Sequence, residues 1–198
     1  MRFFLRFFLF LFVLGIFGAL AAIGVGAYGL WHYGRDLPDY KQLADYEPPT
    51  VTRLHAGDGR LIAEYAKERR VFVPIAAMPR RVKQAFIAAE DQNFYSHYGV
   101  DFVALARAVV TNVVNYAQGR RPVGASTVTQ QVAKNFLLSN EVSIERKIKE
   151  AILAFRIERA LSKDRILELY LNEIYLGYGS YGVAAAALNY FNKSMDEL

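Results

Sequence analysis

A long uncharged segment near the N-terminus constrains this chain more than any other feature of its sequence. The 25 residues from Phe7 to Trp31 include no charged side chain. As an α-helix they would extend about 37 Å, which exceeds the roughly 30 Å hydrocarbon core of a bilayer. The sequence therefore predicts one transmembrane helix over residues 7–31, followed by a folded part outside the bilayer.

The residues around this segment predict its orientation. Arg2 and Arg6 precede it, and positive residues favour the cytoplasmic side, so residues 1–6 are expected in the cytoplasm and the later residues outside. A cleaved secretory signal is the alternative, because Ala19-Leu20-Ala21 has the form of a cleavage tripeptide. The apolar run continues about ten residues past that tripeptide, which favours an uncleaved anchor.

Composition excludes some classes of function. The length of 198 residues fits one domain and the anchor. The absence of cysteine excludes disulfides and thiolate zinc sites. The formal net charge of +5 suits phosphates of lipid head groups or of a lipid-linked substrate near a membrane. We do not expect an exported domain to bind nucleic acid.

A linker and a β-hairpin are expected after the anchor. Residues 32–49 are polar, rich in proline and without periodicity, which is typical of a linker. Within residues 50–75, two alternating runs, 51–55 and 60–65, flank Ala56-Gly57-Asp58-Gly59, which predicts a hairpin. A third short strand is expected over residues 70–74.

Residues 76–198 are expected to form one helical domain. Asp101 is predicted to cap a helix over residues 102–113 whose repeated apolar residues suggest burial. Later helices are predicted to begin after Thr127, Ser143 and Ser162, and the last to span residues 183–191. A mobile basic loop is expected over residues 117–125.

One glutamate in this domain is a candidate general base. Glu90 follows Val82 and Phe86 at helical spacing, so its carboxylate is expected at a helix end, on the apolar stripe and partly buried. By itself, the pair Glu90-Asp91 is more often the solvated end of a helix, with His97 capping a turn. The surrounding pattern, Glu90-Asp91-x-x-Phe94-x-x-His97-x-Gly99-x-Asp101, changes that balance.

Three more patterns follow in order along the chain. They are Gly124-x-Ser126-Thr127-x-Thr129-Gln130-Gln131-x-x-Lys134-Asn135, then Arg146-Lys147-x-x-Glu150, then Lys163-x-x-Ile166-Leu167-Glu168-x-Tyr170-Leu171-Asn172-x-x-Tyr175-x-Gly177. Thr127, Gln130 and Lys134 share a helix face that suits a phosphate, although helix capping alone explains Thr127 and Gln130. Arg146 and Glu150 are equally explained by a salt bridge in solvent.

Together the four patterns resemble the motifs of the peptidoglycan glycosyltransferases, glycosyltransferase family 51. The segment from Tyr46 to Pro79 and the anchor are most similar to class A bifunctional penicillin-binding proteins, 1A type. The resemblance implies a mainly α, lysozyme-like glycosyltransferase domain that polymerises lipid II into glycan strands. It also implies that the chain is a C-terminally truncated piece without the penicillin-sensitive transpeptidase domain of such proteins.

The resemblance assigns roles to individual residues. Glu90 and Glu150 are the implied catalytic residues, and Glu150 is implied either to bind a divalent metal ion, Mg or Mn, or to orient the neighbouring basic side chains. The implied substrate-binding residues are Asp91, Phe94, His97, Ser126, Thr127, Gln130, Gln131, Lys134, Asn135, Arg146, Lys147, Asn172 and Tyr175. The implied partners are lipid II, the growing lipid-linked glycan strand, the inner membrane and other cell-wall synthesis proteins.

Two other functions remain open on the sequence. A lysozyme-like hydrolase or lytic transglycosylase also uses one glutamate at a helix end, but it does not need the basic residues around Lys134 and Arg146. A membrane-anchored scaffold without catalysis is the third reading, and it predicts no effect of an isosteric change at Glu90.

Overall fold

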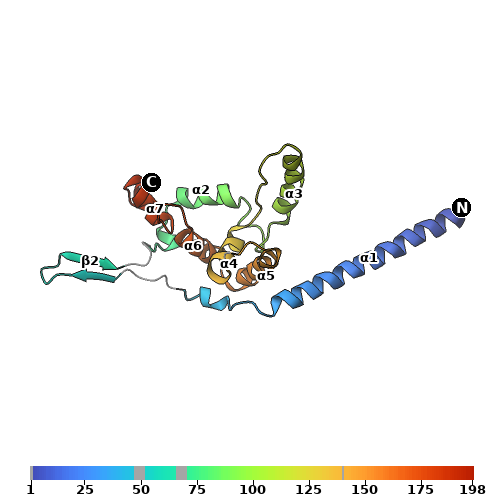
Figure 1. Cartoon of the computed structure of the whole chain (residues 1–198), viewed down its shortest axis with the longest axis horizontal. Coiled ribbons are helices and arrows are strands. Elements are labelled where there is room, and N and C mark those ends of the chain that lie inside the picture. The colour runs from blue at the N-terminus through green and yellow to red at the C-terminus, as the bar shows by residue number, and fades with distance from the viewer. Residues whose placement is uncertain (1, 47–51, 66–70, 140) are drawn as a thin grey trace. The chain divides into compact units, whose positions relative to one another are not determined.

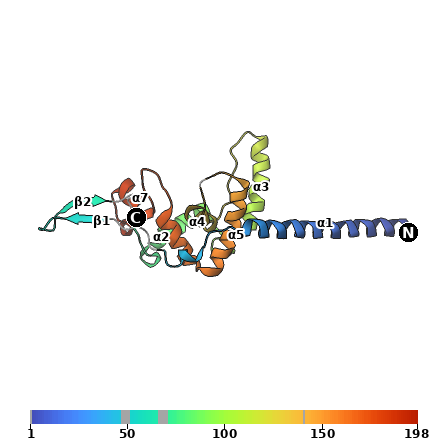
Figure 2. The ribbon, with the colours of Figure 1, turned by 60° about the horizontal axis from the view of Figure 1, so that its bottom comes forward.

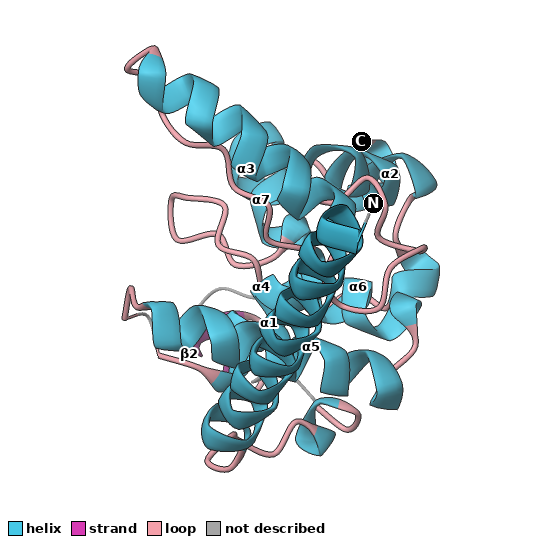
Figure 3. Ribbon diagram, turned by 90° about the vertical axis from the view of Figure 1, so that its right-hand side faces the viewer, coloured by secondary structure: helices cyan, strands magenta, loops and turns pink. Residues whose placement is uncertain are grey.

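The computed structural model describes residues 2–46, 52–65, 71–139 and 141–198. Helices dominate these segments, and strands occur in them only as one two-stranded hairpin (Figure 3). The predicted mainly α fold with a small β-hairpin region is therefore confirmed. The chain divides into two compact units, Met1–Leu37 and Pro38–Leu198.

The first unit is the long helix α1, Arg2–Gly34, which is unbroken in Figure 1. The most apolar 18-residue stretch within Arg6–Gly34 has a mean hydropathy of 2.7, and the apolar side chains of the helix are exposed. The helix continues past Trp31, where the sequence-based prediction ends, and the Arg35 guanidinium lies 4.6 Å from the Trp31 ring centroid. By length and composition, α1 is able to cross a membrane.

The hairpin follows the predicted pattern. Strands β1, Thr52–His55, and β2, Leu61–Tyr65, pair antiparallel, with Thr52 opposite Tyr65. Gly59 takes a φ of +84°, which only glycine adopts without strain. Val51 and Arg70 lie outside the described residues. Residues 71–74 form no strand, so the predicted third strand is wrong over its described part.

The core of the second unit consists of α4, Val128–Leu137, α5, Ile144–Ala160, and α6, Lys163–Glu173. Helix α4 packs against both α5 and α6 (Figures 1 and 2). Their facing side chains are fully or nearly fully buried and include Val132, Leu153, Ile157, Leu167 and Leu171. Burial of this apolar surface is the main stabilising term of the unit.

Side-chain caps begin these helices where the sequence predicts them. Thr127 and Gln130 form a capping box at α4, and the hydroxyl oxygens of Ser143 and Ser162 accept backbone N–H groups at the starts of α5 and α6. The last long helix, α7, spans Val183–Phe191 as predicted. Helix α2, Arg80–Glu90, starts after Pro79, and 3-10 turns lie at Lys41–Leu43, Ile75–Ala77 and Met195–Glu197.

Helix α3, Phe102–Ala117, contradicts one expectation. Asp101 caps it through the Ala104 N–H, as predicted. None of its residues is buried, however, and Val109, Val110 and Val113 are more than half exposed. Figures 1 and 2 show α3 standing apart from α4–α6 over most of its length. The predicted burial is wrong because no described element covers its apolar side.

Polar side chains of α6 hold two earlier segments in place. The Asn172 side chain pairs with both the N–H and the carbonyl of Val73, at 2.8 and 2.9 Å. Glu168 accepts the Ile75 N–H at 2.7 Å, and Arg165 donates to the carbonyl oxygens of Leu43, Ala44 and Tyr46. This polar side of α6 therefore binds backbone from the segments before and after the hairpin.

Candidate active site

Glu90 stands at the rim of a cavity of about 350 Å³. Three segments line this cavity: residues 88–93 at the end of α2, one side of residues 101–111 at the start of α3, and residues 123–127 before α4. Asn112 and Asn115 of α3 hold the loop before α4 through the backbone of Val123 and Arg121. The loop over residues 117–125, which the sequence predicts to be mobile, is thus hydrogen-bonded to α3.

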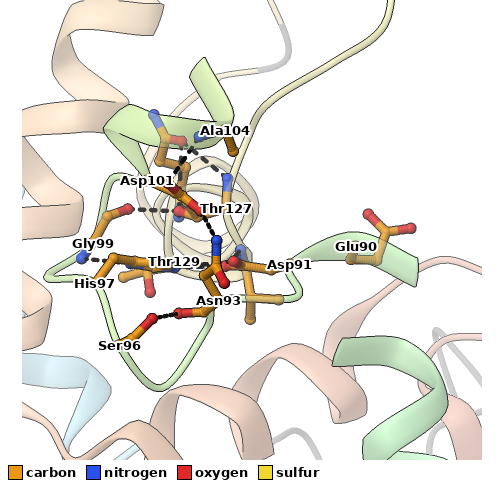
Figure 4. Close-up of polar contacts among 12 residues, drawn as sticks. Glu90, Asp91, Asn93, Ser96, His97, Gly99, Asp101, Ala104, Thr127 and Thr129 are labelled. Atoms are coloured by element: carbon orange, nitrogen blue, oxygen red, sulfur yellow. Dashed lines mark hydrogen bonds and ion pairs between the residues drawn. The ribbon is translucent and has the colours of Figure 1, made fainter. Parts of the chain in front are cut away.

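The Glu90 side chain is exposed, so the predicted partial burial is wrong. Helix α2 ends at Glu90, and Figure 4 shows its carboxylate turned away from the polar network that follows it. The Gln131 amide donates to Glu90 Oε2 at 2.9 Å. Lys134 lies one turn after Gln131 on the same face of α4. Of the two adjacent glutamines in the second sequence pattern, Gln131 therefore contacts Glu90 of the first pattern, whereas Gln130 belongs to the capping box of α4.

The neighbouring Asp91 anchors the site. It is only 7% exposed. Its carboxylate binds His97 Nε2 at 2.9 Å and accepts the Val128 N–H at 3.0 Å, at the first residue of α4 (Figure 4). A carboxylate at a helix N-terminus is stabilised by the helix dipole. With these contacts, Asp91 and His97 fix the α2–α3 loop to α4 and have little surface left for a substrate.

Thr127 adds a second tie between the same segments. Its hydroxyl donates to the Gly99 carbonyl at 2.5 Å and also accepts the Gln130 N–H at 3.2 Å. Gly99 has a φ of +95°, and a Cβ there would lie 2.7 Å from the Ala154 carbonyl carbon. The close approach of this loop to α5 therefore requires glycine. Thr127 and Gln130 serve as capping residues in this arrangement.

A buried ion cluster forms on α5. Glu150 is 1% exposed, its Oε2 accepts Lys147 Nζ at 2.5 Å, and its Oε1 lies 3.0 Å from Arg146 Nε. The Arg146 contact is an ion pair without hydrogen-bond alignment. Lys147 also donates to the Ser126 hydroxyl at 2.9 Å, on the loop that lines the cavity. The Arg146–Glu150 pair is therefore buried and is not the solvent-exposed bridge that spacing alone allows.

The same contacts test the fit of a metal ion at Glu150. Both of its oxygens face cations, and no group of three or more His, Cys, Asp or Glu side chains suited to a metal occurs in the part of the chain that the structure describes. Mg²⁺ and Mn²⁺ prefer several oxygen ligands. Glu150 as placed here fits a counter-ion for Arg146 and Lys147, and it does not fit a metal ligand.

Several predicted binding residues lie away from the cavity lining. Phe94 is fully buried in the core, where Lys163 Nζ lies 4.5 Å from its ring centroid. Asn172 is occupied by the Val73 backbone. Tyr175 is 57% exposed and pairs with Tyr181 in an isolated β-bridge, and Asn135 is exposed on α4. For these residues, substrate contact stays a prediction.

Sequence reasoning missed two residues near Glu90. Arg107 of α3 lines the cavity, and its position five residues after Phe102 in an apolar helix was the available signal. Tyr170 of α6 is 1% exposed, and its ring meets Phe86 of α2 at a centroid distance of 6.3 Å. Tyr170 stands in the fourth sequence pattern, but its spacing there does not indicate proximity to Glu90.

Known proteins are similar to this chain over most of its length. A family model described as Transglycosylase matches residues 58–198. The chain is 60% identical over 189 residues to penicillin-binding protein 1A of Rickettsia felis, covering 94% of this chain and 24% of that protein. It is 47% identical over 187 residues to penicillin-binding protein 1A of Aquifex aeolicus, covering 94% and 25%. The chain thus spans about a quarter of the length of these relatives.

These matches include all four sequence patterns and the residues around the cavity. They confirm the resemblance from which the roles of those residues were taken. The chain therefore belongs to the transglycosylase family.

Proposed function

We propose that this chain catalyses peptidoglycan glycosyl transfer and polymerises lipid II into glycan strands. The observation that carries the proposal is a solvent-accessible carboxylate, Glu90, held by Gln131 at the rim of a cavity whose loop wall contacts the basic residue Lys147. A general base beside cationic groups is what displacement of a diphosphate from a sugar requires. Family membership supports the same reaction.

In the proposed mechanism, Glu90 removes the proton from the 4-hydroxyl of the acceptor sugar. The oxygen attacks the anomeric carbon of the lipid-linked strand while the bond to the polyprenyl diphosphate breaks, so that the configuration at that carbon is inverted. Lys134, Arg146 and Lys147 stabilise the negative charge that develops on the leaving diphosphate. A donor of this type contributes on the order of 3 kcal/mol in a site shielded from water.

Glu150 has a supporting part in this mechanism. Its single negative charge balances one of the two positive charges of Arg146 and Lys147, and its contacts fix both side chains on α5. Pre-organised charges cost little reorganisation when the diphosphate leaves. The proposed mechanism needs no metal-ligand role for Glu150.

We further infer that α1 anchors the chain in the inner membrane. Its N-terminus lies in the cytoplasm and the catalytic unit outside it, in accord with the arginines that precede the apolar segment. Both proposed substrates have lipid tails in the same bilayer, so the anchor raises the local concentration of enzyme and substrate. Penicillin-sensitive transpeptidation by the longer protein and contacts with other cell-wall synthesis proteins belong to the same proposal.

Product analysis tests this function against glycan cleavage. The purified chain is incubated with lipid II in detergent, and in parallel with preformed glycan strands. We expect long lipid-linked glycan from the first reaction and no soluble muropeptides from the second. Release of muropeptides without polymer would instead identify a lytic enzyme, and no reaction with either substrate would support a scaffold without catalysis.

A further inference from the structure

The hydroxyl of Tyr170 is the least explained polar group near the candidate active site. Tyr170 is 1% exposed on α6, and its hydroxyl oxygen has no hydrogen-bond partner among the residues that the structure describes. A buried hydroxyl without a partner destabilises a folded protein, and such groups are uncommon in native structures. Phenylalanine would fill the same space without this cost, so the hydroxyl calls for a functional explanation.

The surroundings of Tyr170 relate it to Glu90. Phe86 lies four residues before Glu90 on α2, and its ring packs edge-on against the Tyr170 ring at 6.3 Å between centroids. Burial, and then the negative charge of Glu90, raise the pKa of Tyr170. The Tyr170 hydroxyl therefore remains protonated near neutral pH and is available as a hydrogen-bond donor.

Glu90 has acceptor capacity to match this donor. Gln131 occupies its Oε2 at 2.9 Å. Within the described ranges, no hydrogen bond reaches its other carboxylate oxygen, Oε1. A carboxylate accepts hydrogen bonds at both oxygens, and a tyrosine hydroxyl can donate one. An unused donor on α6 and an unused acceptor on α2 thus occur on two helices that touch through the Tyr170 and Phe86 rings, one helical turn before Glu90.

We propose that Tyr170 is a positioning residue for Glu90, and that its buried hydroxyl donates a hydrogen bond to the second Glu90 oxygen when substrate fills the cavity. With Gln131 on one side and Tyr170 on the other, the carboxylate is held in one orientation toward the acceptor hydroxyl. This inference rests on the proposed function, because it assigns Glu90 the role of general base. The Glu90 side chain is exposed, and the Tyr170 hydroxyl has no hydrogen-bond partner among the residues that the structure describes.

The proposal predicts how the pH dependence of the rate changes when the Tyr170 hydroxyl is removed. A hydrogen bond donated to a carboxylate favours its ionised form, so loss of the donor disfavours ionisation. Among the described residues, the charged groups that line the cavity with Glu90 are Arg107 of α3, its cap Asp101 and Asp91 in the adjoining loop, and Lys134 follows Gln131 by one turn on α4. All of them are unchanged when only the Tyr170 hydroxyl is removed. The acid limb of the pH–rate profile should therefore move to higher pH.

The test is Tyr170→Phe, which keeps the ring and removes one oxygen atom. Lipid II polymerisation by the full chain in detergent is measured across pH, together with thermal unfolding. We expect kcat to fall about ten- to a hundredfold with little change in KM. We also expect the acid limb to move to higher pH and the unfolding temperature to stay equal or rise, because an unpaired buried hydroxyl is lost.

Two matched variants give the comparison. Tyr116→Phe removes an exposed hydroxyl on α3, where Tyr116 is 89% exposed, and should leave rate and stability unchanged. Tyr190→Phe removes a hydroxyl that donates to the Leu176 carbonyl at 2.7 Å, and should lower the unfolding temperature. A loss of stability in Tyr170→Phe as large as that in Tyr190→Phe would show that the hydroxyl is structural, which overturns the inference.

The outcome also separates this inference from the proposed function. An active parent whose Tyr170→Phe variant keeps the parental kcat and pH profile contradicts the positioning role alone. An inactive parent, or full activity after Glu90→Gln, contradicts the proposed function and this inference together.

Discussion

At Glu150, two cations share one buried carboxylate. Arg146 and Lys147 contact its two oxygens, and Lys147 also reaches Ser126 on the cavity loop. The position of Lys147 is therefore set by a residue that is itself inaccessible to substrate. Spacing along α5 predicts the Arg146–Glu150 pair, but burial of that pair depends on how α4 and the cavity loop cover α5, which spacing cannot show.

This arrangement predicts two results for Glu150→Gln. The free energy of unfolding should fall by roughly 2 kcal/mol. Breaking a fully buried ion pair costs about 3–5 kcal/mol, but here Lys147 is half exposed and solvent weakens its attraction to Glu150. The response of polymerisation to EDTA and added Mg²⁺ should match that of the parent, because Glu150 pairs with the side chains of Arg146 and Lys147 and does not bind a metal ion. Unfolding in urea and activity across Mg²⁺ concentrations measure both.

Glu145→Gln is the matched control for that experiment. Glu145 pairs with Lys149 at 2.6 Å on the same helix, but its side chain is 56% exposed. Its removal should cost at most about 1 kcal/mol. A Glu150→Gln variant that unfolds like the parent but loses its Mg²⁺ response would instead identify Glu150 as a metal ligand.

Single residues also show where sequence reasoning stops. The patterns point to Glu90, Gln131 and Lys147, and the structure relates these to one cavity. The patterns do not separate residues that face the cavity from residues that support it. Asp91 and Phe94 occur in the same pattern as Glu90, yet the first ties α4 to the loop and the second fills the core.

Among the elements, α3 combines a well-defined start with an exposed apolar surface. Asp101 begins the helix, while the Asn93 amide donates to its second carboxylate oxygen at 2.8 Å. The Ala104 N–H, followed by the Asn93 amide, lowers the pKa of Asp101. The Asp101 carboxylate therefore holds the loop at Asn93, caps α3 and lines the cavity.

Acid should weaken this start of α3. Because the pKa of Asp101 is lower in the folded chain than its unfolded value of about 3.9, its stabilising effect is complete above that value and is lost as the pH falls through the folded pKa. Asp101→Asn keeps a cap acceptor without the charge. The difference in unfolding free energy between parent and variant should shrink between pH 7 and pH 3. A difference that stays constant over this range would contradict the assigned cap.

Prediction from sequence succeeds where an element is defined locally. Capping residues define the starts of α4, α5 and α6, and small residues followed by Asn192 in the left-handed region define α7. The expected burial of α3 fails because an apolar repeat indicates a surface that avoids water, but not which element covers it. The expected burial of Glu90 fails for a similar reason. The apolar stripe of Val82 and Phe86 predicts which side of α2 avoids water, but not that the end of the helix at Glu90 is left exposed.

For the whole molecule, the apolar helix α1 and the catalytic unit are separate compact parts. Removing residues 1–33 should lower polymerisation of membrane-embedded lipid II much more than polymerisation of a short-chain analogue in detergent. Tethering raises the effective concentration at the bilayer surface and does not alter the chemical step. Equal losses with both substrates would show that α1 supports the fold or the site itself.

The central claim is that Glu90 is the base for polymerisation of lipid II. The most direct measurement compares initial polymerisation rates of the parent and Glu90→Gln, with Glu145→Gln as a control for loss of one carboxylate and thermal unfolding as a control for the fold. The amide keeps the shape of the side chain but cannot accept the proton, so the rate should fall about 10²- to 10⁴-fold while the unfolding temperature is unchanged. A Glu90→Gln rate above roughly a tenth of the parental rate would contradict the claim.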